Sequence, residues 1–288
     1  MEKILITGGS GFFASRFAEK YKYEYKIASY DKKSLDITND KNVKDIFYAE
    51  KPDIVIHTAA IAVTDFCNKF PEKAYQVNVE GTLNVARMCR EVGSKMVFIS
   101  SEQIFNGNKE PGPYDENHLA VPDTVYGQNK LECEKLLNEI LDKLWIVRFT
   151  WLFGCIDRNL SPGTNIMREV ITSILKGDKI KASPNEFRGM TYVWDMVEQF
   201  DNLFKSPYDT YNLGSENEYS RYEIVEYIFK EMGLSHRISD LLIKDEEKYK
   251  DHPRDVRLSA KKARDCGMVF DKTSSALKRC IEEYHLSL

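Results

Sequence analysis

The first half of the chain alternates short apolar segments with longer segments that mix apolar and polar residues. The short segments are rich in Ile, Val and Phe, and they are Lys3–Thr7, Lys26–Tyr30, Asp53–His57, Lys95–Ser100 and Trp145–Phe149. Apolar residues on both faces are typical of strands buried in a parallel sheet. Between them, Glu80–Val92 repeats apolar residues at helical spacing. Strand and helix in alternation predict a doubly wound α/β sheet.

The pattern changes after Gly154, where helical segments become more frequent. The expected helices are Asn165–Leu175, Tyr192–Phe204 and Tyr222–Met232, with one short strand at Thr210–Leu213. The second half therefore reads as a smaller, mainly helical domain with one return to the sheet. The expected boundaries are 1–154 for the first domain, joined by a return segment 188–214, and 155–187 with 215–288 for the second.

Composition and charge exclude several classes of protein. The 288 residues carry a formal net charge of −4, without the basic footprint of a nucleic-acid binder. We find no long apolar run or secretory signal, so we expect a cytoplasmic protein without a membrane segment. The six cysteines form no CxxC pair and the five histidines are scattered. We therefore expect reduced thiols and no metal site.

The first strand leads directly into the sequence Gly8-Gly9-Ser10-Gly11-Phe12-Phe13-Ala14, and a helical segment follows. Gly8 allows a tight turn, and Gly11 lets the backbone approach a pyrophosphate at the helix N-terminus. Ala14 is small enough for close packing of helix on strand. This arrangement predicts a Rossmann-type dinucleotide site that includes Gly8, Ser10, Gly11, Phe12 and Phe13.

Asp31 follows the second strand, 20 residues after Gly11. A carboxylate at this point can accept hydrogen bonds from the ribose hydroxyls and would repel a 2′-phosphate. Lys32 and Lys33 lie next to it and could instead accommodate that phosphate. The cofactor is therefore expected to be NAD(H) or NADP(H), with NAD(H) slightly favoured.

Tyr126 and Lys130 form a Tyr-x-x-x-Lys pair at the start of a helical segment, Gly127–Asp142. Residues four apart share one helix face, so the ammonium can lie near the phenol and lower its pKa. Such a phenol can exchange a proton with a carbonyl or hydroxyl group. Ser100 and Ser101 end the fourth strand, and because side chains alternate, only one is expected to face the cleft.

At this point the chain resembles the extended short-chain dehydrogenase/reductase superfamily, and within it the dTDP-4-dehydrorhamnose reductase group. That group has a Ser-Thr-Asp-Tyr-Val-Phe-Asp-Gly segment, which corresponds here to Ser100–Gly107. Its Pro-Tyr-x-Glu motif recurs at Pro113–Glu116, and its Arg-x-x-Trp-x-x-Gly motif recurs at Arg148–Gly154. The resemblance covers nearly the whole chain.

The resemblance implies a role for particular residues. Ser101 would take the place of the catalytic Thr beside Tyr126 and Lys130. Asp36 and Ile37 would line the adenine pocket. The ribose and nicotinamide would be positioned by Ala59, Ala60 and Asn78. The sugar would be faced by Glu102, Gln103 and Trp151. A nucleotide sugar is the expected small-molecule partner, and the expected assembly is a homodimer, although the sequence does not fix the oligomeric state.

The chain departs from the group's pattern at three positions. An Asp-Tyr pair is replaced by Glu102 and Gln103, and an Arg before a late Pro is replaced by His252. Arg254 or Arg257 is a candidate for the substrate diphosphate, because guanidinium groups suit bidentate phosphate contacts. Gln103 cannot exchange a proton near neutral pH, which disfavours the dehydratases of the superfamily.

These residues favour an NAD(P)H-dependent reductase of a 4-keto-6-deoxy nucleotide sugar, as in dTDP-rhamnose biosynthesis. Two alternatives stay open at this stage. One is a non-catalytic, cofactor-binding regulatory subunit similar to the methionine adenosyltransferase β-subunit. The other is an NAD-dependent epimerase of nucleotide sugars.

Overall fold

The computed structural model describes residues 1–287, and the chain divides into two compact units. Unit 1 comprises 1–108, 117–149 and 205–211, and unit 2 comprises 109–116, 150–204 and 212–288. The expected first domain and its return segment include four segments that these units assign to unit 2, namely 109–116, 150–154, 188–204 and 212–214. The segment that returns to the sheet is shorter, because residues 188–204 pack within unit 2. The segment 109–116, expected in the first domain, belongs to unit 2.

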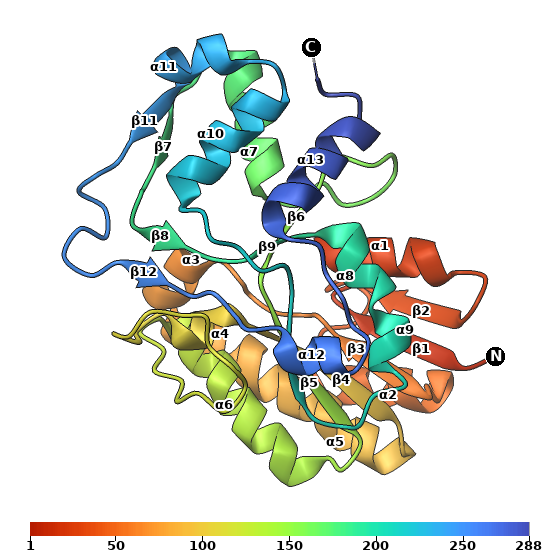
Figure 1. Cartoon of the computed structure of the whole chain (residues 1–288). Coiled ribbons are helices and arrows are strands. Elements are labelled where there is room, and N and C mark those ends of the chain that lie inside the picture. The colour runs from red at the N-terminus through yellow and green to blue at the C-terminus, as the bar shows by residue number, and fades with distance from the viewer. Residues whose placement is uncertain (288) are drawn as a thin grey trace. The chain divides into compact units, whose positions relative to one another are not determined.

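Unit 1 is built on a six-stranded sheet with the order β10-β5-β4-β3-β1-β2 (Figure 1). The strands are β1 (Lys3–Thr7), β2 (Lys26–Tyr30), β3 (Ile54–His57), β4 (Lys95–Ser101), β5 (Leu144–Phe149) and β10 (Thr210–Leu213). The pairs from β2 through β1, β3 and β4 to β5 are all parallel. The carboxyl ends of these strands therefore meet at one edge of the sheet, where an α/β fold binds its ligands.

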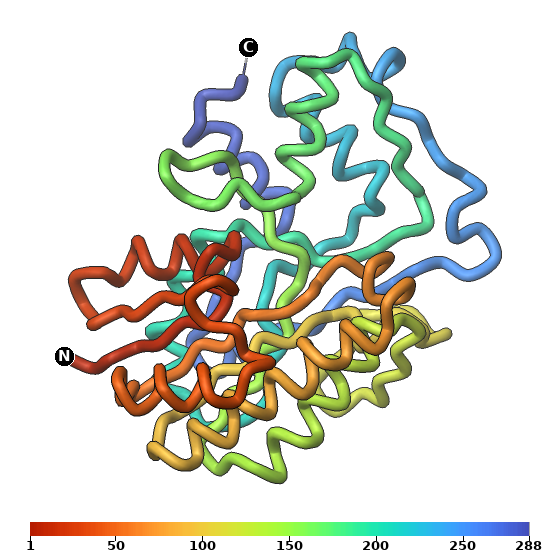
Figure 2. The backbone as a smooth tube through the Cα atoms, turned by 180° about the vertical axis from the view of Figure 1, so that it is seen from behind, coloured from red at the N-terminus to blue at the C-terminus, as the bar shows by residue number. Residues whose placement is uncertain are grey.

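The helices of unit 1 lie between successive strands, and Figure 2 shows this winding of the chain from red to yellow-green. They are α1 (Phe12–Tyr21), α2 (Asp40–Glu50), α3 (Thr64–Lys69), α4 (Pro71–Tyr75), a π-turn η1 (Gln76–Glu80), α5 (Gly81–Val92), a 3₁₀ turn η2 (Glu102–Phe105) and α6 (Val125–Ile140). One core cluster joins buried residues of α2, α5 and α6 to the sheet. The expected doubly wound α/β fold is thus confirmed.

The elements of unit 1 differ from expectation mainly at their ends. Helix α6 begins at Val125 rather than Gly127, because the Thr124 side chain accepts a hydrogen bond from Gly127 N and caps it. The second strand, expected to be buried, is partly exposed, since β2 is the edge of the sheet. The helix expected to start at Glu80 is preceded by the π-turn η1.

Unit 2 is mainly helical, as expected for a smaller second domain. Its helices are α7 (Ile166–Lys176), α8 (Val193–Glu198), α9 (Phe200–Leu203), α10 (Arg221–Glu231), η3 (Ser235–Arg237), α11 (Ile238–Leu241), α12 (Lys261–Asp265) and α13 (Thr273–Glu283). Its short strands are β6 (Trp151–Phe153), β7 (Ile180–Ala182), β8 (Glu186–Phe187), β9 (Met190–Tyr192), β11 (Leu242–Lys244) and β12 (Arg254–Asp255).

One of the helices expected in unit 2 is not continuous. Tyr192–Phe204 divides into α8 and α9, and Tyr192 itself ends β9 because that strand pairs with β6. Helix α10 begins at Arg221, where Ser220 and Glu223 form a capping box. The short pairs β6–β9, β7–β11 and β8–β12 were not expected, because two- and three-residue strands carry too little periodicity to be recognised.

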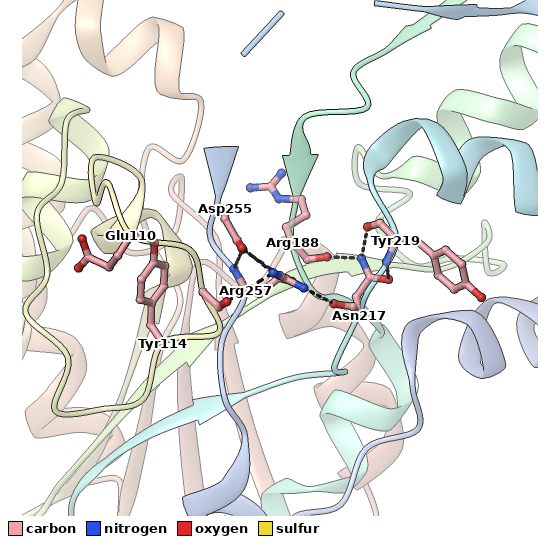
Figure 3. A network of polar contacts seen from close by, with 8 residues as sticks. Glu110, Tyr114, Arg188, Asn217, Tyr219, Asp255 and Arg257 are labelled. Atoms are coloured by element: carbon pink, nitrogen blue, oxygen red, sulfur yellow. Dashed lines mark hydrogen bonds and ion pairs between the residues drawn. The ribbon is translucent and has the colours of Figure 1, made fainter. Parts of the chain in front are cut away.

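The Pro-Tyr-x-Glu motif is explained by its contacts within unit 2. The backbone of Tyr114 exchanges hydrogen bonds with the carbonyl of Arg257 and the amide of Ser259. Glu116 accepts a hydrogen bond from the backbone amide of Asn212 at 2.8 Å. Figure 3 shows Tyr114 on this segment near Arg257. The motif therefore fastens the 109–116 segment to unit 2, where its carboxylate and backbone groups find their partners.

Candidate active site

The glycine-rich segment forms the tight turn that the sequence predicts. Gly8 has φ of +71°, and a Cβ there would lie 2.8 Å from the backbone nitrogen of Ala59, so only glycine fits. The amide of Gly11 closes the turn on the carbonyl of Gly8 at 2.8 Å. Helix α1 then begins without a side-chain cap or an acidic residue in its first turn. Its free N-terminal amide groups suit a phosphate.

A cavity of about 360 Å³ runs from this turn along the carboxyl ends of β1, β2 and β3. It is lined by seven of the residues predicted to bind the cofactor: Gly8, Ser10, Gly11, Asp36, Ile37, Ala59 and Ala60. Asp36 is held by two hydrogen bonds from Thr38, and these lower the pKa of its carboxyl. The cavity has the glycine turn and uncapped helix that a dinucleotide needs, so the residues fit a nicotinamide dinucleotide.

Asp31 and Asn78 are among the predicted cofactor residues that do not line this cavity. The Asp31 carboxylate accepts hydrogen bonds from the Ser34 hydroxyl at 2.8 Å and from backbone amides, and these bonds lower its pKa. Asn78 is buried and bonds both backbone groups of Ile61, at 2.7 and 3.0 Å. Asn78 therefore shapes the loop after β3 and does not reach the cavity itself.

Several cavity residues were missed by the sequence analysis. They include Lys32, Leu35, Thr38, Thr58, Ile61, Lys73, Gln76 and Val77. Lys32 was noticed only as an alternative to Asp31. Lys73 and Gln76 belong to α4 and η1, and no pattern in the sequence indicates that these two elements reach the cavity. Thr58 lies between His57 and Ala59, so proximity to a predicted residue was its only signal.

A second cavity, of about 200 Å³, shares Gly11, Thr58 and Ala60 with the first and continues to Tyr126 and Lys130. Its other lining residues are Phe12, Phe13, Ala14, Ala62, Ile99 and Phe149. The phosphate turn and the Tyr-x-x-x-Lys pair are thus brought to one continuous hollow of unit 1. This arrangement places a proton-transfer group at the end of the cavity opposite the adenosine side.

The serines at the end of β4 point in different directions. Ser101 accepts a hydrogen bond from the Gln103 amide at 3.2 Å and hydrogen-bonds with Tyr126. Ser100 is buried and donates to a carboxylate oxygen of Glu134 at 2.6 Å. The two serines thus have different partners, as alternation along the strand requires, and of the two it is Ser101 that contacts Tyr126. It also caps the turn η2.

The protonation of Tyr126 and Lys130 is governed by burial. Desolvation raises the pKa of the Tyr126 phenol above its ordinary value of 10, while the Ser101 hydrogen bond acts in the opposite direction. Burial lowers the pKa of Lys130 to about 8. The Lys130 ammonium lies 5.8 Å from the Tyr126 ring centroid and donates to the Ile99 carbonyl at 2.6 Å. The lowered phenol pKa expected from the Tyr-x-x-x-Lys spacing is therefore not found, because the net shift is upward and burial is its largest cause.

Glu102 and Gln103, predicted to face the sugar, lie in η2 beside Tyr126. Both are buried, with 2% and 9% of their surfaces exposed. The Glu102 carboxylate raises the pKa of Tyr126, so its charge acts on the phenol. Gln103 accepts a hydrogen bond from Asn106 at 3.3 Å through its side-chain oxygen. Neither residue lines the two cavities described above, and that they face the sugar stays a prediction.

In unit 2, Trp151 lies between two arginines that sequence reasoning missed. The guanidinium of Arg188 is 5.0 Å from the Trp151 ring centroid, and that of Arg221 is 5.5 Å away. Arg221 also forms a two-pronged ion pair with Glu169, both distances being 2.7 Å. Arginine side chains next to an aromatic ring form a cationic surface that can bind an anionic group and an apolar ring of the same ligand.

The two arginines considered for the substrate diphosphate are already engaged. Arg254 forms an ion pair with Glu186 at 3.0 Å. Arg257 binds both carboxylate oxygens of Asp255, at 2.9 and 2.6 Å, which raises its pKa (Figure 3). Arg257 is thus part of the polar network drawn in Figure 3, and both arginines keep part of their surface exposed.

Within residues 1–287, His, Cys, Asp and Glu side chains form no group of three or more suited to a metal ion. All six cysteines are free thiols. No helix in the same part of the chain is both long and apolar enough to cross a membrane.

The fold and the site together define a class: a Rossmann-type domain with a Ser/Tyr/Lys set and a helical second unit is an extended short-chain dehydrogenase/reductase. The comparisons give the family. The chain belongs to the RmlD substrate binding domain family, whose model matches residues 1–286. The resemblance stated from the motifs is thereby confirmed.

Individual relatives agree with this family. The spore coat polysaccharide biosynthesis protein SpsK of Bacillus subtilis is 26% identical over 284 residues, which is 98% of each chain. The crystal structure of dTDP-4-dehydrorhamnose reductase from Bacillus anthracis, in complex with NADP, is 29% identical with a TM-score of 0.86, and it covers 98% of this chain and 99% of that one. The methionine adenosyltransferase 2 subunit beta of Bos taurus is 26% identical, over 57% of this chain and 51% of its own.

Proposed function

We propose that the protein is an NAD(P)H-dependent reductase that acts on a 4-keto-6-deoxy nucleotide sugar of the dTDP-4-dehydrorhamnose type. The observation that carries this proposal is the cavity of unit 1, which begins at the phosphate turn and ends at Tyr126 and Lys130 beside Ser101. The similarity to a dTDP-4-dehydrorhamnose reductase over 98% of the chain supports the same reaction.

Each residue of the set has a separate task in this proposal. When bound, the reduced nicotinamide supplies the hydride that reaches the 4-keto carbon. Tyr126 Oη donates a proton to the carbonyl oxygen, which becomes a hydroxyl. Ser101 Oγ holds that oxygen in place, and Lys130 contributes positive charge near it and a hydrogen-bond donor for the cofactor ribose.

The raised pKa of Tyr126 fits the direction of this reaction. A phenol that donates a proton must begin protonated, and burial together with Glu102 keeps it so at neutral pH. The phenolate left after the transfer is stabilised by the ammonium of Lys130 and by Ser101. Lys130, with a pKa of about 8, is still mostly charged near pH 7. These directions are compatible with Tyr126 as the proton donor and with Lys130 as the cation next to it.

The choice between NADPH and NADH depends on the residues after β2. The sequence slightly favoured NAD(H) because of Asp31. Its carboxylate is held by Ser34, and Lys32 rather than Asp31 lines the cavity. We propose that Lys32 lets NADPH bind at least as well as NADH. NADP in the Bacillus anthracis reductase supports this assignment.

The residues assigned to the substrate are taken within each unit separately. In unit 1, Glu102 and Gln103 stand beside Tyr126 and are assigned to the sugar. In unit 2, Trp151 is assigned to the sugar nucleotide, with the cations that surround it, Arg188 and Arg221, as binding groups for the diphosphate. Arg254 stays a further candidate. The homodimer and the cytoplasmic location stay predictions from the sequence.

The test is turnover of a nucleotide sugar. Purified protein is mixed with NADPH or NADH and with dTDP-4-dehydrorhamnose, and loss of the reduced cofactor is followed by absorbance. We expect stoichiometric oxidation, with Tyr126→Phe slower by about 10²- to 10⁴-fold because the proton donor is gone. NADPH binding by the variant, measured by fluorescence, should change less than about threefold.

Other results would redirect the proposal. Cofactor binding without turnover on dTDP-, UDP- or GDP-linked 4-keto sugars would contradict a reductase and favour a regulatory subunit. Interconversion of nucleotide sugars without net loss of NADH, on a cofactor that stays bound through purification, would favour an epimerase. Both outcomes are visible in the same set of assays.

A further inference from the structure

A buried ionic cluster lies on the catalytic helix, one turn beyond Lys130. Glu134 of α6 accepts a hydrogen bond from Ser100 Oγ at 2.6 Å through Oε1. Arg148 of β5 reaches both of its oxygens, with Nε 3.0 Å from Oε1 and Nη2 2.7 Å from Oε2. Only 5% of Glu134 and 6% of Arg148 is exposed. None of these three groups contacts the cavities described above.

Burial of such a pair is costly, since both charges lose their hydration, and a buried ion pair is weak evidence for stability. Its clearest value is to specify one arrangement of the elements that carry it. Here the elements are β4, β5 and α6, and they contribute Ser100, Arg148 and Glu134 to the cluster. The Arg148 guanidinium also lies 5.4 Å from the ring centroid of Phe105, the last residue of η2.

The cluster completes a row of contacts between α6 and the end of β4. Gly127 packs so closely on the Gln103 carbonyl that a Cβ could not be accommodated. Lys130 Nζ donates to the Ile99 carbonyl at 2.6 Å. Glu134 then binds Ser100. Gly127, Lys130 and Glu134 lie on three successive turns of α6. They contact Gln103, Ile99 and Ser100, respectively, of β4 and η2. A shift of the helix by one turn, about 5.4 Å, would break all three contacts.

We propose that Glu134, Arg148 and Ser100 are positioning residues that fix the register of α6, so that Tyr126 stands beside Ser101 and Lys130 beside the cofactor ribose. This inference rests on the reductase function proposed above. Tyr126, Lys130 and Glu134 are spaced by four residues and share one face of the helix, so a movement at Glu134 is transmitted to both. A displacement of about 1 Å at a reacting group can cost on the order of 10²-fold in rate.

The proposal is tested by changing the length of the carboxylate side chain while its charge is kept. Glu134→Asp preserves the ion pair but must draw α6 toward β5 or lengthen the contact. We expect kcat to fall by about tenfold, whereas KM and the Kd for NADPH change by less than about threefold. Glu132→Asp is the matched control, because Glu132 is on the same helix and bonds only the exposed Tyr75 hydroxyl at 2.7 Å. Its kcat should stay within twofold.

A second readout does not depend on turnover. Hydrogen exchange of residues 125–134, measured without substrate, should be faster in Glu134→Asp than in Glu132→Asp if the cluster holds the helix. If wild-type protein reduces no nucleotide sugar, the proposed function fails, but this exchange measurement still decides the role of the cluster.

The outcomes separate positioning from plain stability. A lower melting temperature with kcat unchanged for folded protein, measured well below that temperature, would overturn the proposal. So would unchanged exchange in α6. If Glu134→Asp does not fold, Arg148→Lys provides the same test, because it keeps the charge but loses the two-pronged geometry. A tenfold lower kcat with an unchanged KM in that variant would support the proposal.

Discussion

At the carboxyl end of β4, the two faces of the strand carry adjacent serines that have different hydrogen-bond partners. Ser101 faces Tyr126 at the end of the cavity, and Ser100 faces Glu134 under the catalytic helix. The difference arises only from the alternation of side chains along a strand. Adjacent serines that look equivalent in the sequence therefore have different partners because of the pleat of the sheet, and we propose different roles for them.

The two sides also differ in how charge is compensated. Beside Ser100, the Glu134 carboxylate is matched by Arg148 at 2.7 Å. On the side of Ser101, burial shifts the pKa of Tyr126 upward and that of Lys130 down to about 8 without an ion-pair partner for either in the contacts described. Shifted pKa values that are not neutralised locally are typical of functional groups, whereas fully paired charges are typical of structure.

The largest effect that separates the two sides should come from paired serine variants. Ser101→Ala removes a hydroxyl from the carbonyl oxygen, and we expect kcat to fall by about 30- to 100-fold. Ser100→Ala removes one neutral donor from a carboxylate that keeps both contacts to Arg148, so kcat should fall by no more than about threefold. Steady-state assays with NADPH and the 4-keto sugar measure both.

Equal losses in the two variants would contradict this assignment. A larger loss for Ser100→Ala would mean that the positioning cluster, rather than the hydroxyl near Tyr126, limits the rate. The melting temperature of each variant serves as the control, because Ser101 also caps η2 through the Gln103 amide.

Prediction from sequence succeeded where one strand-and-turn pattern specifies both fold and site. The Gly8–Gly11 turn follows a strand whose bounds, Lys3–Thr7, are as expected, and the cavity begins there. It failed where tertiary packing decides. Trp151 was found by a motif, but Arg188 and Arg221 lie 37 and 70 residues further along the chain, and only the fold brings them to its ring.

The protonation of the site could not be predicted for a related reason. Helical spacing correctly placed Lys130 near Tyr126, and this suggested a lowered phenol pKa. Burial and the neighbouring Glu102 raise that pKa instead. Desolvation depends on how many side chains surround a group, and the sequence of one helix does not contain that information.

A buried histidine on the Ser100 side, His57, allows that side to be tested through the pH dependence of protein stability. His57 hydrogen-bonds Thr7 at 2.8 Å and Thr82 at 2.9 Å, and its ring stacks on Phe98. Burial, with a contribution from Lys130, lowers its pKa from 6.5 to about 3. The unfolded chain therefore binds a proton first as the pH falls. The contribution of neutral His57 to the free energy of unfolding is fully present above pH 6.5 and is lost as the pH falls from 6.5 to about 3.

Near pH 5 this difference amounts to ~2 kcal/mol of unfolding free energy, or about 30-fold in the unfolding constant. His57→Gln cannot take up the proton, so its stability should fall less steeply over this range. Urea unfolding at several pH values measures the two slopes. Parallel curves for wild type and variant would show that His57 is protonated in the folded state as readily as in the unfolded chain.

The smallest effect is expected at the opposite end of the cavity, where specificity for the cofactor is decided. Lys32→Ala removes one of the two lysines that line the cavity, the one whose charge acts on Asp36, and an exposed ammonium–phosphate contact is modest in energy. We expect KM for NADPH to rise by about five- to tenfold, while KM for NADH changes by less than twofold. Lys33→Ala is the control, since Lys33 is exposed and does not line the cavity. Equal changes for both cofactors would show that Lys32 acts on the shared adenosine, and an effect of Lys33→Ala on NADPH alone would move the phosphate contact to the next residue.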